Sequence, residues 1–462
     1  MNKRILLVSP ARNYPLGTGQ YPSGALLLLG AILMREGNIV KVVHMAADRV
    51  AVADFVALLT DFGPDIVGFT ASTYQTRHTR ILSSIVKKFN KDIMTVAGGL
   101  HPSALKSEFL KTFPDVDVVV YGEGEHAIVA LSKGVPLSGI RGICYRDGDV
   151  VTNPPEPMLS PAELDTLPMP DKTLVNFKQY SGLFPVGRRP CMFLMSSRGC
   201  PFNCRFCSKS IYGNTLRLRS PDNVMEEIEV LHGHWGVREI HLSDDTFNAN
   251  LDWAHGLLDK IINKGYNKKL IFRVALRVNE KILNAELLKH LKAAGVWFIY
   301  YGVENGNQGM LDRMGKGITV AEIKRAFKLT CEVGINTEAF FIIGMPGETV
   351  GTVKDSYNLY REIRPWWGGF SKAVPFPGTL FTQEVKAKGH LLCDNYDDFN
   401  PSDMMVRTDT MSADELNMWT NRLNQMTRKS KILKPKQMMY LAIDQARSVI
   451  SEKMWTKPGG SI

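Results

Sequence analysis

The sequence predicts an α/β protein with two successive units of alternating strands and helices, followed by a helical C-terminal region. Two observations predict this fold class. Short apolar runs alternate with longer amphipathic stretches through residues 1–135, and the same alternation returns through residues 191–388. Glycine-rich or polar motifs follow many of the apolar runs, as they do at the carboxyl ends of parallel strands.

The first unit, residues 1–135, is predicted to form a flavodoxin-like or Rossmann-like parallel sheet. Small residues follow its last three expected strands: Ser72 and Thr73, then Gly98 and Gly99, then Gly122 and Gly124. Open α/β sheets bind ligands at the carboxyl ends of strands, and glycine lets a ligand approach the backbone. The three motifs together therefore predict a ligand-binding edge. Strands are expected at 4–8, 39–44, 66–70, 93–97 and 116–121, and helices at 24–36, 51–60 and up to about 88.

Residues 136–190 contain many prolines and are predicted to be a linker. Within them, Asp147-Gly148 is flanked by strand-like residues, which predicts a small hairpin over 143–151.

The second unit, residues 191–388, is predicted to be a partial (βα)6 barrel. Its first helix is expected to begin at Ser220-Pro221, a capping residue followed by proline at the first helical position. Residues 389–462 form the helical C-terminal region, with helices expected at 413–428 and 436–450. The six barrel strands are expected at 192–196, 239–243, 270–275, 296–302, 337–344 and 369–374.

Three cysteines, Cys200, Cys204 and Cys207, have C-x3-C-x2-C spacing directly after the first barrel strand. Three thiolates on one loop can each bind one iron of a [4Fe–4S] cluster and leave the fourth iron open. A zinc site is the less favoured alternative, because zinc usually takes four ligands in two pairs. Seven cysteines form an odd and sparse set, which argues against a disulfide framework and leaves isolated thiols as small buried residues.

This spacing, with Phe206 before the third cysteine, resembles the signature of radical S-adenosylmethionine (SAM) enzymes. Together with the strand-end motifs of the first unit, it resembles the class B type, which has a cobalamin-binding domain at the N-terminal side. The resemblance implies that Cys200, Cys204 and Cys207 hold a [4Fe–4S] cluster. It also implies that SAM and cobalamin are cofactors.

The resemblance implies roles for residues of both units. Asp245 and Glu304 would lie near the methionine and ribose parts of SAM, and the strand end at Gly344 near adenine. The alternatives are a helix-capping turn for Asp244 and Asp245, and a salt bridge for Glu304. The corrin would lie against the first unit, whose matching residues are Ser72, Thr73, Gly98, Gly99, His101, Gly122, Glu123 and Gly124.

The D-x-H-x-x-G motif, whose histidine binds cobalt in many cobalamin proteins, is missing from the sequence. We therefore expect His101 to be a loop residue near the corrin and not a cobalt ligand. A first unit that has lost corrinoid binding is the alternative.

The resemblance favours a methyltransferase that acts on an unactivated carbon through a 5′-deoxyadenosyl radical. The alternative is an oxidative cyclase or rearrangement enzyme of the anaerobic magnesium-protoporphyrin monomethyl ester cyclase type. A tRNA methylthiotransferase is disfavoured because residues 1–143 contain no cysteine for a second cluster. A non-catalytic corrinoid carrier is disfavoured by the cysteines beside a full set of βα units.

Composition agrees with a cytoplasmic protein: 44% hydrophobic and 22% charged residues are ordinary for a globular chain. No apolar run reaches the length of a membrane span. The net charge of +10 is spread along the chain, so nucleic acid is not expected as a partner. The expected partners are a small-molecule substrate and an electron donor such as flavodoxin or ferredoxin.

Overall fold

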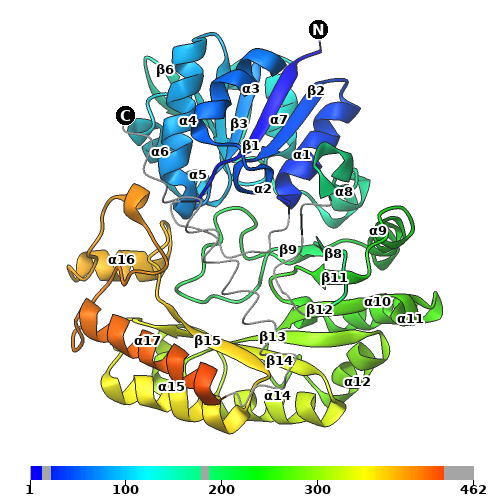
Figure 1. Cartoon of the computed structure of the whole chain (residues 1–462), viewed down its shortest axis with the longest axis vertical. Helices are drawn as coiled ribbons and strands as arrows, with labels where there is room; N and C mark the ends of the chain where they lie inside the picture. Colours follow the sequence, from blue (N-terminus) through cyan, green and yellow to red (C-terminus); the bar gives the residue numbers. More distant parts are fainter. Residues whose placement is uncertain (1, 13–21, 178–179, 181–186, 431–462) are drawn as a thin grey trace.

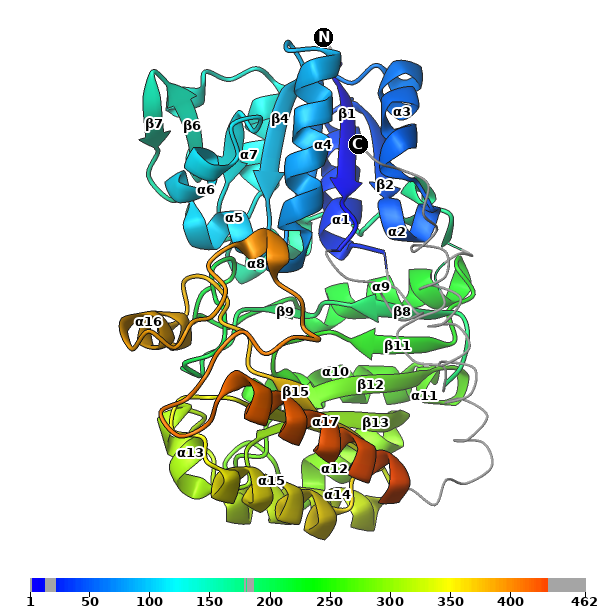
Figure 2. The same ribbon diagram turned by 60° about the vertical axis from the view of Figure 1, so that its left-hand side comes forward.

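The computed structural model describes residues 2–12, 22–177, 180 and 187–430. Within them, a seven-stranded sheet and a six-stranded sheet form two units, one above the other in Figure 1. In the upper unit, β1 (Arg4–Ser9) and β4 (Met94–Gly98) run toward the lower unit, so their carboxyl ends lie at the junction (Figure 2). None of the helices in these residues is long and apolar enough to cross a membrane.

The upper sheet has the strand order β2-β1-β3-β4-β5-β6-β7, and its first five strands are parallel. Helices α1 and α7 pack on one face through Leu26 and Ile128, and α3 and α4 pack on the other through Phe55 and Leu82. The parallel strands and their helices are β1, α1 (Gly24–Arg35), β2 (Ile39–His44), α2 (Met45–Asp48), α3 (Phe55–Phe62), β3 (Ile66–Thr70), α4 (Thr76–Phe89), β4, α5 (Leu100–Leu105), α6 (Ser107–Thr112), β5 (Val118–Val120) and α7 (Glu125–Ser132).

The predicted hairpin is present as β6 (Ile143–Asp147) and β7 (Asp149–Thr152), with Gly148 at φ +71° in the turn. It does not stand alone in a linker, because β6 pairs antiparallel with β5. The hairpin therefore extends the upper sheet. Buried Ile143 and Tyr145 explain this, since they complete the hydrophobic core beneath β5.

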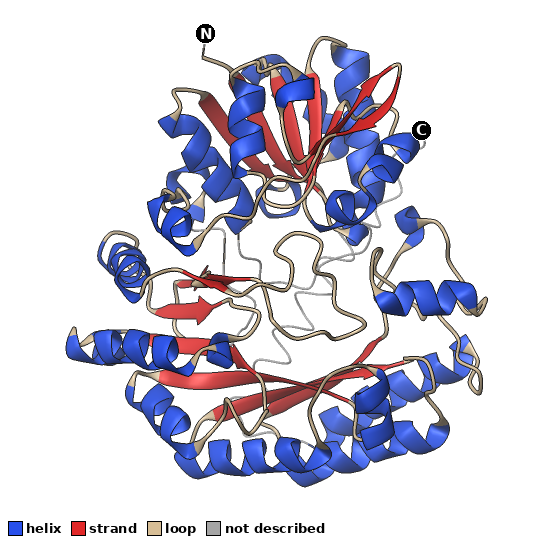
Figure 3. Cartoon of the chain, turned by 180° about the vertical axis from the view of Figure 1, so that it is seen from behind, coloured by secondary structure: helices blue, strands red, loops and turns tan. Residues whose placement is uncertain are grey.

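The lower sheet contains six parallel strands in the order β15-β14-β13-β12-β11-β8, each beside the next in the sequence. Helices cover its outer face (Figure 3), which is the expected partial barrel. The elements are β8 (Cys191–Leu194), α9 (Pro221–Gly233), β11 (Glu239–Leu242), α10 (Leu251–Asn263), α11 (Tyr266–Lys269), β12 (Ile271–Leu276), α12 (Ala285–Ala293), β13 (Val296–Glu304), α13 (Gln308–Arg313), α14 (Val320–Val333), β14 (Asn336–Ile343), α15 (Val350–Ile363), β15 (Trp367–Lys372) and α16 (Leu380–Ala387).

Two further segments complete the described chain. A short ladder of β9 (Ser197–Arg198) and β10 (Arg217–Leu218) follows β8, and α8 (Pro161–Thr166) lies between the two units. Helix α17 (Ala413–Ser430) packs beside β15, where the Asn424 side chain bonds to both backbone polar groups of Phe370 at 2.9 and 2.8 Å. The predicted helix over 436–450 lies outside the described residues.

Candidate cofactor site

The cysteine loop follows β9 at the carboxyl end of β8. Gly199, at φ +82°, precedes the first cysteine, and a Cβ atom there would collide with the Thr215 carbonyl oxygen. The loop is fixed further on by the Arg205 amide, which donates to the Met314 carbonyl at 2.9 Å. Lys209 Nζ donates to the carbonyl of Cys200 at 2.9 Å. These contacts hold a loop on which Cys200 and Cys204 are half-buried and Cys207 is exposed.

The three thiols are close enough to influence one another. Cys207 reaches solvent, yet burial by nearby protein atoms, together with Cys204, Asp245 and Cys200, raises its pKa to about 11. Ionised thiols at this spacing repel each other, so bound iron would relieve the repulsion. In the described residues no group of His, Cys, Asp or Glu converges on a single metal ion. A cubane fits this geometry because each thiolate binds a different iron.

Arg277 connects the cysteine loop with the ends of the barrel strands. Its guanidinium lies 3.7 Å from the centre of the Phe202 ring, and Nη1 is 3.5 Å from Cys204 Sγ. Its Nε donates to Asn279 at 2.9 Å, and its Nη2 donates to the carbonyl of Lys316. A fixed positive charge beside a thiolate stabilises the deprotonated form that binds iron.

Asp244 connects the carboxyl ends of two barrel strands and does not cap a helix. Its carboxylate accepts hydrogen bonds from the Ser196 amide at 3.0 Å, Ser196 Oγ at 2.6 Å and Ser197 Oγ at 2.7 Å. Burial raises the pKa of Asp244, which these hydrogen bonds oppose. Asp245 is exposed near the cysteines, and Asn250 caps the following helix, α10. The capping interpretation of the two aspartates is therefore wrong.

Glu304 ends β13 with the left-handed φ of +66°, which is strained for a residue with a side chain. Its Oε1 accepts from Lys316 Nζ at 2.6 Å, and both side chains are buried. The salt-bridge interpretation of Glu304 is thus confirmed. Lys316 was not predicted as a partner of Glu304. In the sequence, the only relation between the two residues is a separation of 12 residues with a helix between them.

Gly344 follows β14 with φ +104°, a conformation suited to glycine. Its amide donates to Glu348 Oε2 at 3.3 Å. Burial raises the pKa of Glu348 to about 7, although Thr352, Asn305 and the Gly344 amide all donate to its carboxyl group. Phe206 is partly buried against the core of the lower unit. These residues form the barrel end of the site.

A large cavity lies between the two units. Its empty volume is about 1480 Å³, including space open to solvent. The cavity continues between the upper sheet and α1, where Leu7 and Gly68 line it. From the lower unit it is lined by Met195, Arg198 and Tyr212, which flank the cysteine loop. Of the predicted corrin-contact residues, Gly98, Gly99, Gly122, Glu123 and Gly124 line it.

The glycine edge, formed by Gly98, Gly99, Gly122 and Gly124, lines the cavity with backbone. Gly99 has φ +104°, and a Cβ atom there would lie 3.0 Å from the Ala71 carbonyl oxygen. Gly122 has φ +78° with open space where a Cβ would stand. Among the described residues that line the cavity there is no histidine. The backbone at these glycines fits a corrin that is held by shape, and the absence of a histidine ligand to cobalt stays a prediction.

His101 differs from its expected position. It is the second residue of α5 and not a loop residue, it is fully buried, and it does not line the cavity. Its Nδ1 is 3.1 Å from Thr73 Oγ1, and its ring meets Tyr396 edge-on at 4.7 Å between centroids. Burial lowers the pKa of His101 to about 3, so the ring is neutral. Ser72 and Thr73 also lie outside the cavity lining. The segment that follows them packs against residues 396–398 of the C-terminal region, where Thr76 Oγ1 donates to the Tyr396 carbonyl.

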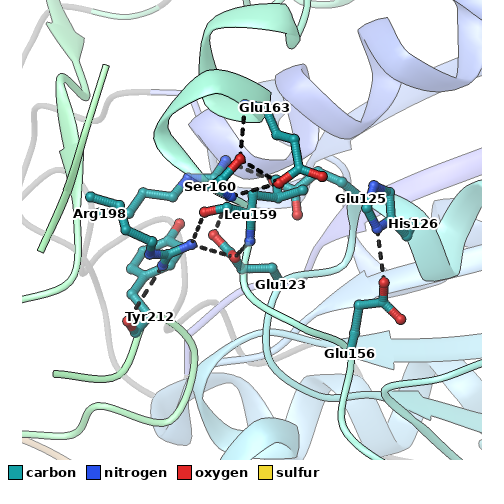
Figure 4. A network of polar contacts seen from close by, with 10 residues as sticks. Glu123, Glu125, His126, Glu156, Leu159, Ser160, Glu163, Arg198 and Tyr212 are labelled. Atoms are coloured by element: carbon teal, nitrogen blue, oxygen red, sulfur yellow. Dashed lines mark hydrogen bonds and ion pairs between the residues drawn. The ribbon is translucent and has the colours of Figure 1, made fainter. Parts of the chain in front are cut away.

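Two glutamates and two arginines form a buried network at the junction of the units (Figure 4). Arg198 donates to Glu123 at 2.5 Å and to Glu125 at 2.7 Å, and Arg217 donates to Glu123 at 2.6 Å. Glu123 Oε2 also accepts from the Leu159 amide at 2.8 Å. Burial opposes the charge of Arg198, but Glu125 and Glu123 raise its pKa above the ordinary value. Neither arginine was predicted from the sequence to belong to the site.

Comparison with known proteins agrees with this arrangement. The model of the radical SAM superfamily matches residues 194–360, and that of the B12 binding domain matches residues 18–132. An uncharacterized methyltransferase of Pyrococcus horikoshii is 31% identical over 423 residues, which cover 89% of this chain and 90% of the relative. The chain belongs to the class B radical SAM enzymes with a cobalamin-binding domain. The match to the radical SAM superfamily gives the [4Fe–4S] cluster and SAM as cofactors, and the match to the B12 binding domain gives cobalamin.

Other similar chains have different activities. The anaerobic magnesium-protoporphyrin IX monomethyl ester cyclase of Rubrivivax gelatinosus is 29% identical, covering 89% of this chain and 75% of the relative. Among solved structures, the methyltransferase TsrM of Kitasatospora setae, with cobalamin and a [4Fe–4S] cluster bound, has a TM-score of 0.69 at 22% identity. It covers 91% of this chain and 85% of TsrM. At that identity the likeness establishes the fold alone.

Proposed function

We propose that this class B radical SAM enzyme is a cobalamin-dependent methyltransferase that acts on an unactivated carbon of a small molecule. One observation carries the proposal: a single cavity is lined both by the glycine edge of the upper sheet and by residues that flank the cysteine loop. Two cofactors can act on the same carbon only if they face the same space. The methyltransferase of Pyrococcus horikoshii, similar over nearly its whole length, supports methyl transfer.

The residues at the barrel end would hold the cluster and SAM. When bound, the cluster supplies the electron that cleaves SAM to a 5′-deoxyadenosyl radical, and cobalamin carries the methyl group. Cys200, Cys204 and Cys207 would bind iron. Asp245 and Glu304 would contact the methionine and ribose parts of SAM, and the backbone at Gly344 would contact adenine, with Phe206 supporting the loop.

The upper unit would hold the corrin through backbone and shape. Gly98, Gly99, Gly122 and Gly124 present a surface without side chains toward the cavity. Glu123 also lines the cavity, but its carboxylate oxygens accept hydrogen bonds from Arg198, Arg217 and the Leu159 amide. Ser72, Thr73 and His101 would support this edge from behind, because they lie outside the cavity lining.

An oxidative cyclase is the second candidate. The observation that favours it is the similarity to anaerobic magnesium-protoporphyrin IX monomethyl ester cyclases, at 29% identity over 428 residues and 30% over 396 residues. The two activities would differ in the residues that surround the substrate.

A substrate-free experiment separates the two. The anaerobically reconstituted protein is incubated with cob(I)alamin and SAM labelled on the methyl group. We expect label in the corrinoid fraction and an equal amount of S-adenosylhomocysteine, because methyl loading needs no substrate. Label that stays on SAM, while reductant still yields 5′-deoxyadenosine, would overturn the methyltransferase and favour the cyclase.

The electron donor, such as flavodoxin or ferredoxin, and the cytoplasmic location stay predictions from the sequence. Reduction of the cluster by purified flavodoxin, followed by its EPR signal, tests the donor.

A further inference from the structure

The junction of the two units contains two positive and two negative side chains, all buried. Glu123 and Glu125 come from the loop after β5 and the start of α7, in the upper unit. Arg198 and Arg217 come from β9 and β10, in the lower unit. Their relative exposure is 5–7%. Buried charges demand fixed partners, because an unpaired charge away from water is costly.

The two arginines lie directly opposite each other in the β9–β10 ladder. Like charges in such a pair repel. Here the carboxylate of Glu123 accepts one guanidinium through Oε1 and the other through Oε2, at 2.5 and 2.6 Å. The ladder is therefore electrostatically complete only when the Glu123 loop of the upper unit contacts it.

Arg198 holds the central position in this network. It alone binds both glutamates, and the Tyr212 ring lies 5.3 Å from its guanidinium carbon. In the sequence it stands two residues before Cys200. Through Glu123 it contacts the same loop, residues 122–124, that lines the cavity at the glycine edge. A rigid, forked side chain thus connects the expected corrin surface with the start of the cysteine loop.

We propose that Arg198 is a positioning residue, which sets the separation between the cluster and the corrin by clamping the Glu123–Glu125 loop to the β9 strand. This proposal rests on the proposed function, since it requires corrinoid in the cavity. Arg198 also lines the cavity, but the positioning role requires no bond from it to either cofactor. Its effect reaches the reaction through the two loops that it joins.

The test measures the separation directly. Cob(II)alamin and the reduced cluster are both paramagnetic, and the coupling between their EPR signals falls steeply with distance. We expect Arg198→Met to retain iron and corrinoid at wild-type content but to change this coupling. Transfer of the SAM methyl group to the corrin should fall by about 100-fold, as small misplacements of reacting groups can cause. Cleavage of SAM to 5′-deoxyadenosine, which needs only the cluster, should stay within about twofold.

The matched control is Glu156→Gln. Glu156 is also a glutamate near this junction, but its partners His126 and Arg141 both belong to the upper unit (Figure 4). We expect the control to keep the wild-type coupling and both reactions. Arg198→Lys keeps the charge without the fork that spans two carboxylates, so it should also keep wild-type cofactor content and still change the coupling.

The outcomes are distinguishable. If wild-type protein binds no corrinoid, the proposed function fails before Arg198 is tested. If wild-type protein carries both cofactors and Arg198→Met leaves both the coupling and the methyl transfer unchanged, the positioning role is overturned. Should Arg198→Met fail to fold, Glu125→Ala replaces it, because this change removes one partner of Arg198 and leaves Glu123 on both arginines. An unchanged coupling in Glu125→Ala would then overturn the role.

Discussion

The barrel edge of the lower unit and the glycine edge of the upper unit present different chemical groups. The barrel edge presents three thiols surrounded by charged groups, with Arg277 at Cys204 and Lys316 at Glu304. The glycine edge presents bare backbone at its glycines beside Glu123, whose carboxylate is paired with Arg198 and Arg217, and the described residues of its lining include no histidine. The first edge is suited to bind through bonds and charge, and the second through shape. Substitutions should therefore affect the two edges in different ways.

The largest effect is expected at the thiols. Replacing Cys200, Cys204 and Cys207 together with Ala should remove all cluster iron, because no other group on the loop can replace three thiolates. Iron analysis and the visible spectrum of reconstituted protein check this. Cys144→Ala should keep about four irons per chain, since Cys144 is buried in the core of the upper unit. Full iron in the triple variant would show that the cluster assignment is wrong.

A bulky side chain at the glycine edge should weaken corrinoid binding without changing iron content. Gly98 ends β4 without a positive φ, and its Cβ would meet only ordinary contacts, so Gly98→Val should fold. The added side chain enters the cavity and should weaken the affinity for cobalamin by at least about tenfold, which is 1.4 kcal/mol. Equilibrium titration monitored by absorbance measures this. Gly139→Val, outside the cavity, is the control.

The free energy of unfolding should decrease as pH rises because of Glu348. Because the pKa of Glu348 is raised from 4.5 to about 7 in the folded state, its contribution to stability is fully present below pH 4.5, is lost as pH rises from there through 7, and levels off above that. Between pH 6 and 8 the free energy of unfolding should decrease by on the order of 1 kcal/mol from this group. Urea unfolding of wild-type protein and Glu348→Gln measures it. Equal pH slopes in the two proteins would contradict the raised pKa.

The smallest effect on a cofactor is expected at His101. Because its ring is buried against Thr73 and Tyr396, outside the cavity lining, His101→Ala should leave the cobalt coordination spectrum unchanged. EPR of the cob(II)alamin form is the measurement. Loss of a nitrogen hyperfine splitting in the variant would show that His101 reaches cobalt after all.

Local sequence signals were enough to predict most of the fold. Strands and helices follow from the apolar periodicity: β2 and β3 match the expected ranges residue for residue, and the other core strands lie within a few residues. The pairing of the hairpin with β5 was not predictable from Asp147-Gly148, because a turn signal does not say which strand lies beside it. The sequence motif Cys200–Cys207 was enough to predict a cluster loop, because all three thiols lie on one short segment.

The network partners could not be predicted in the same way. Arg198 and Glu123 are separated by 75 residues, and each resembles an ordinary surface charge in the sequence. His101 belonged to a glycine-rich motif, yet packing against Tyr396, nearly 300 residues away, gives it a buried role. Contacts between segments so far apart depend on how the two units pack, which no local pattern encodes.

The contact between Asn424 and Phe370 has a consequence for association between molecules. β15 is an edge of an incomplete barrel, and such an edge offers unpaired amides and carbonyls to any other strand. The carboxamide of Asn424 supplies one acceptor and one donor to Phe370, as a residue of a seventh strand would. A single side chain on α17 thus imitates a piece of β-sheet. At this point of β15, the barrel is closed to an incoming strand of a second molecule.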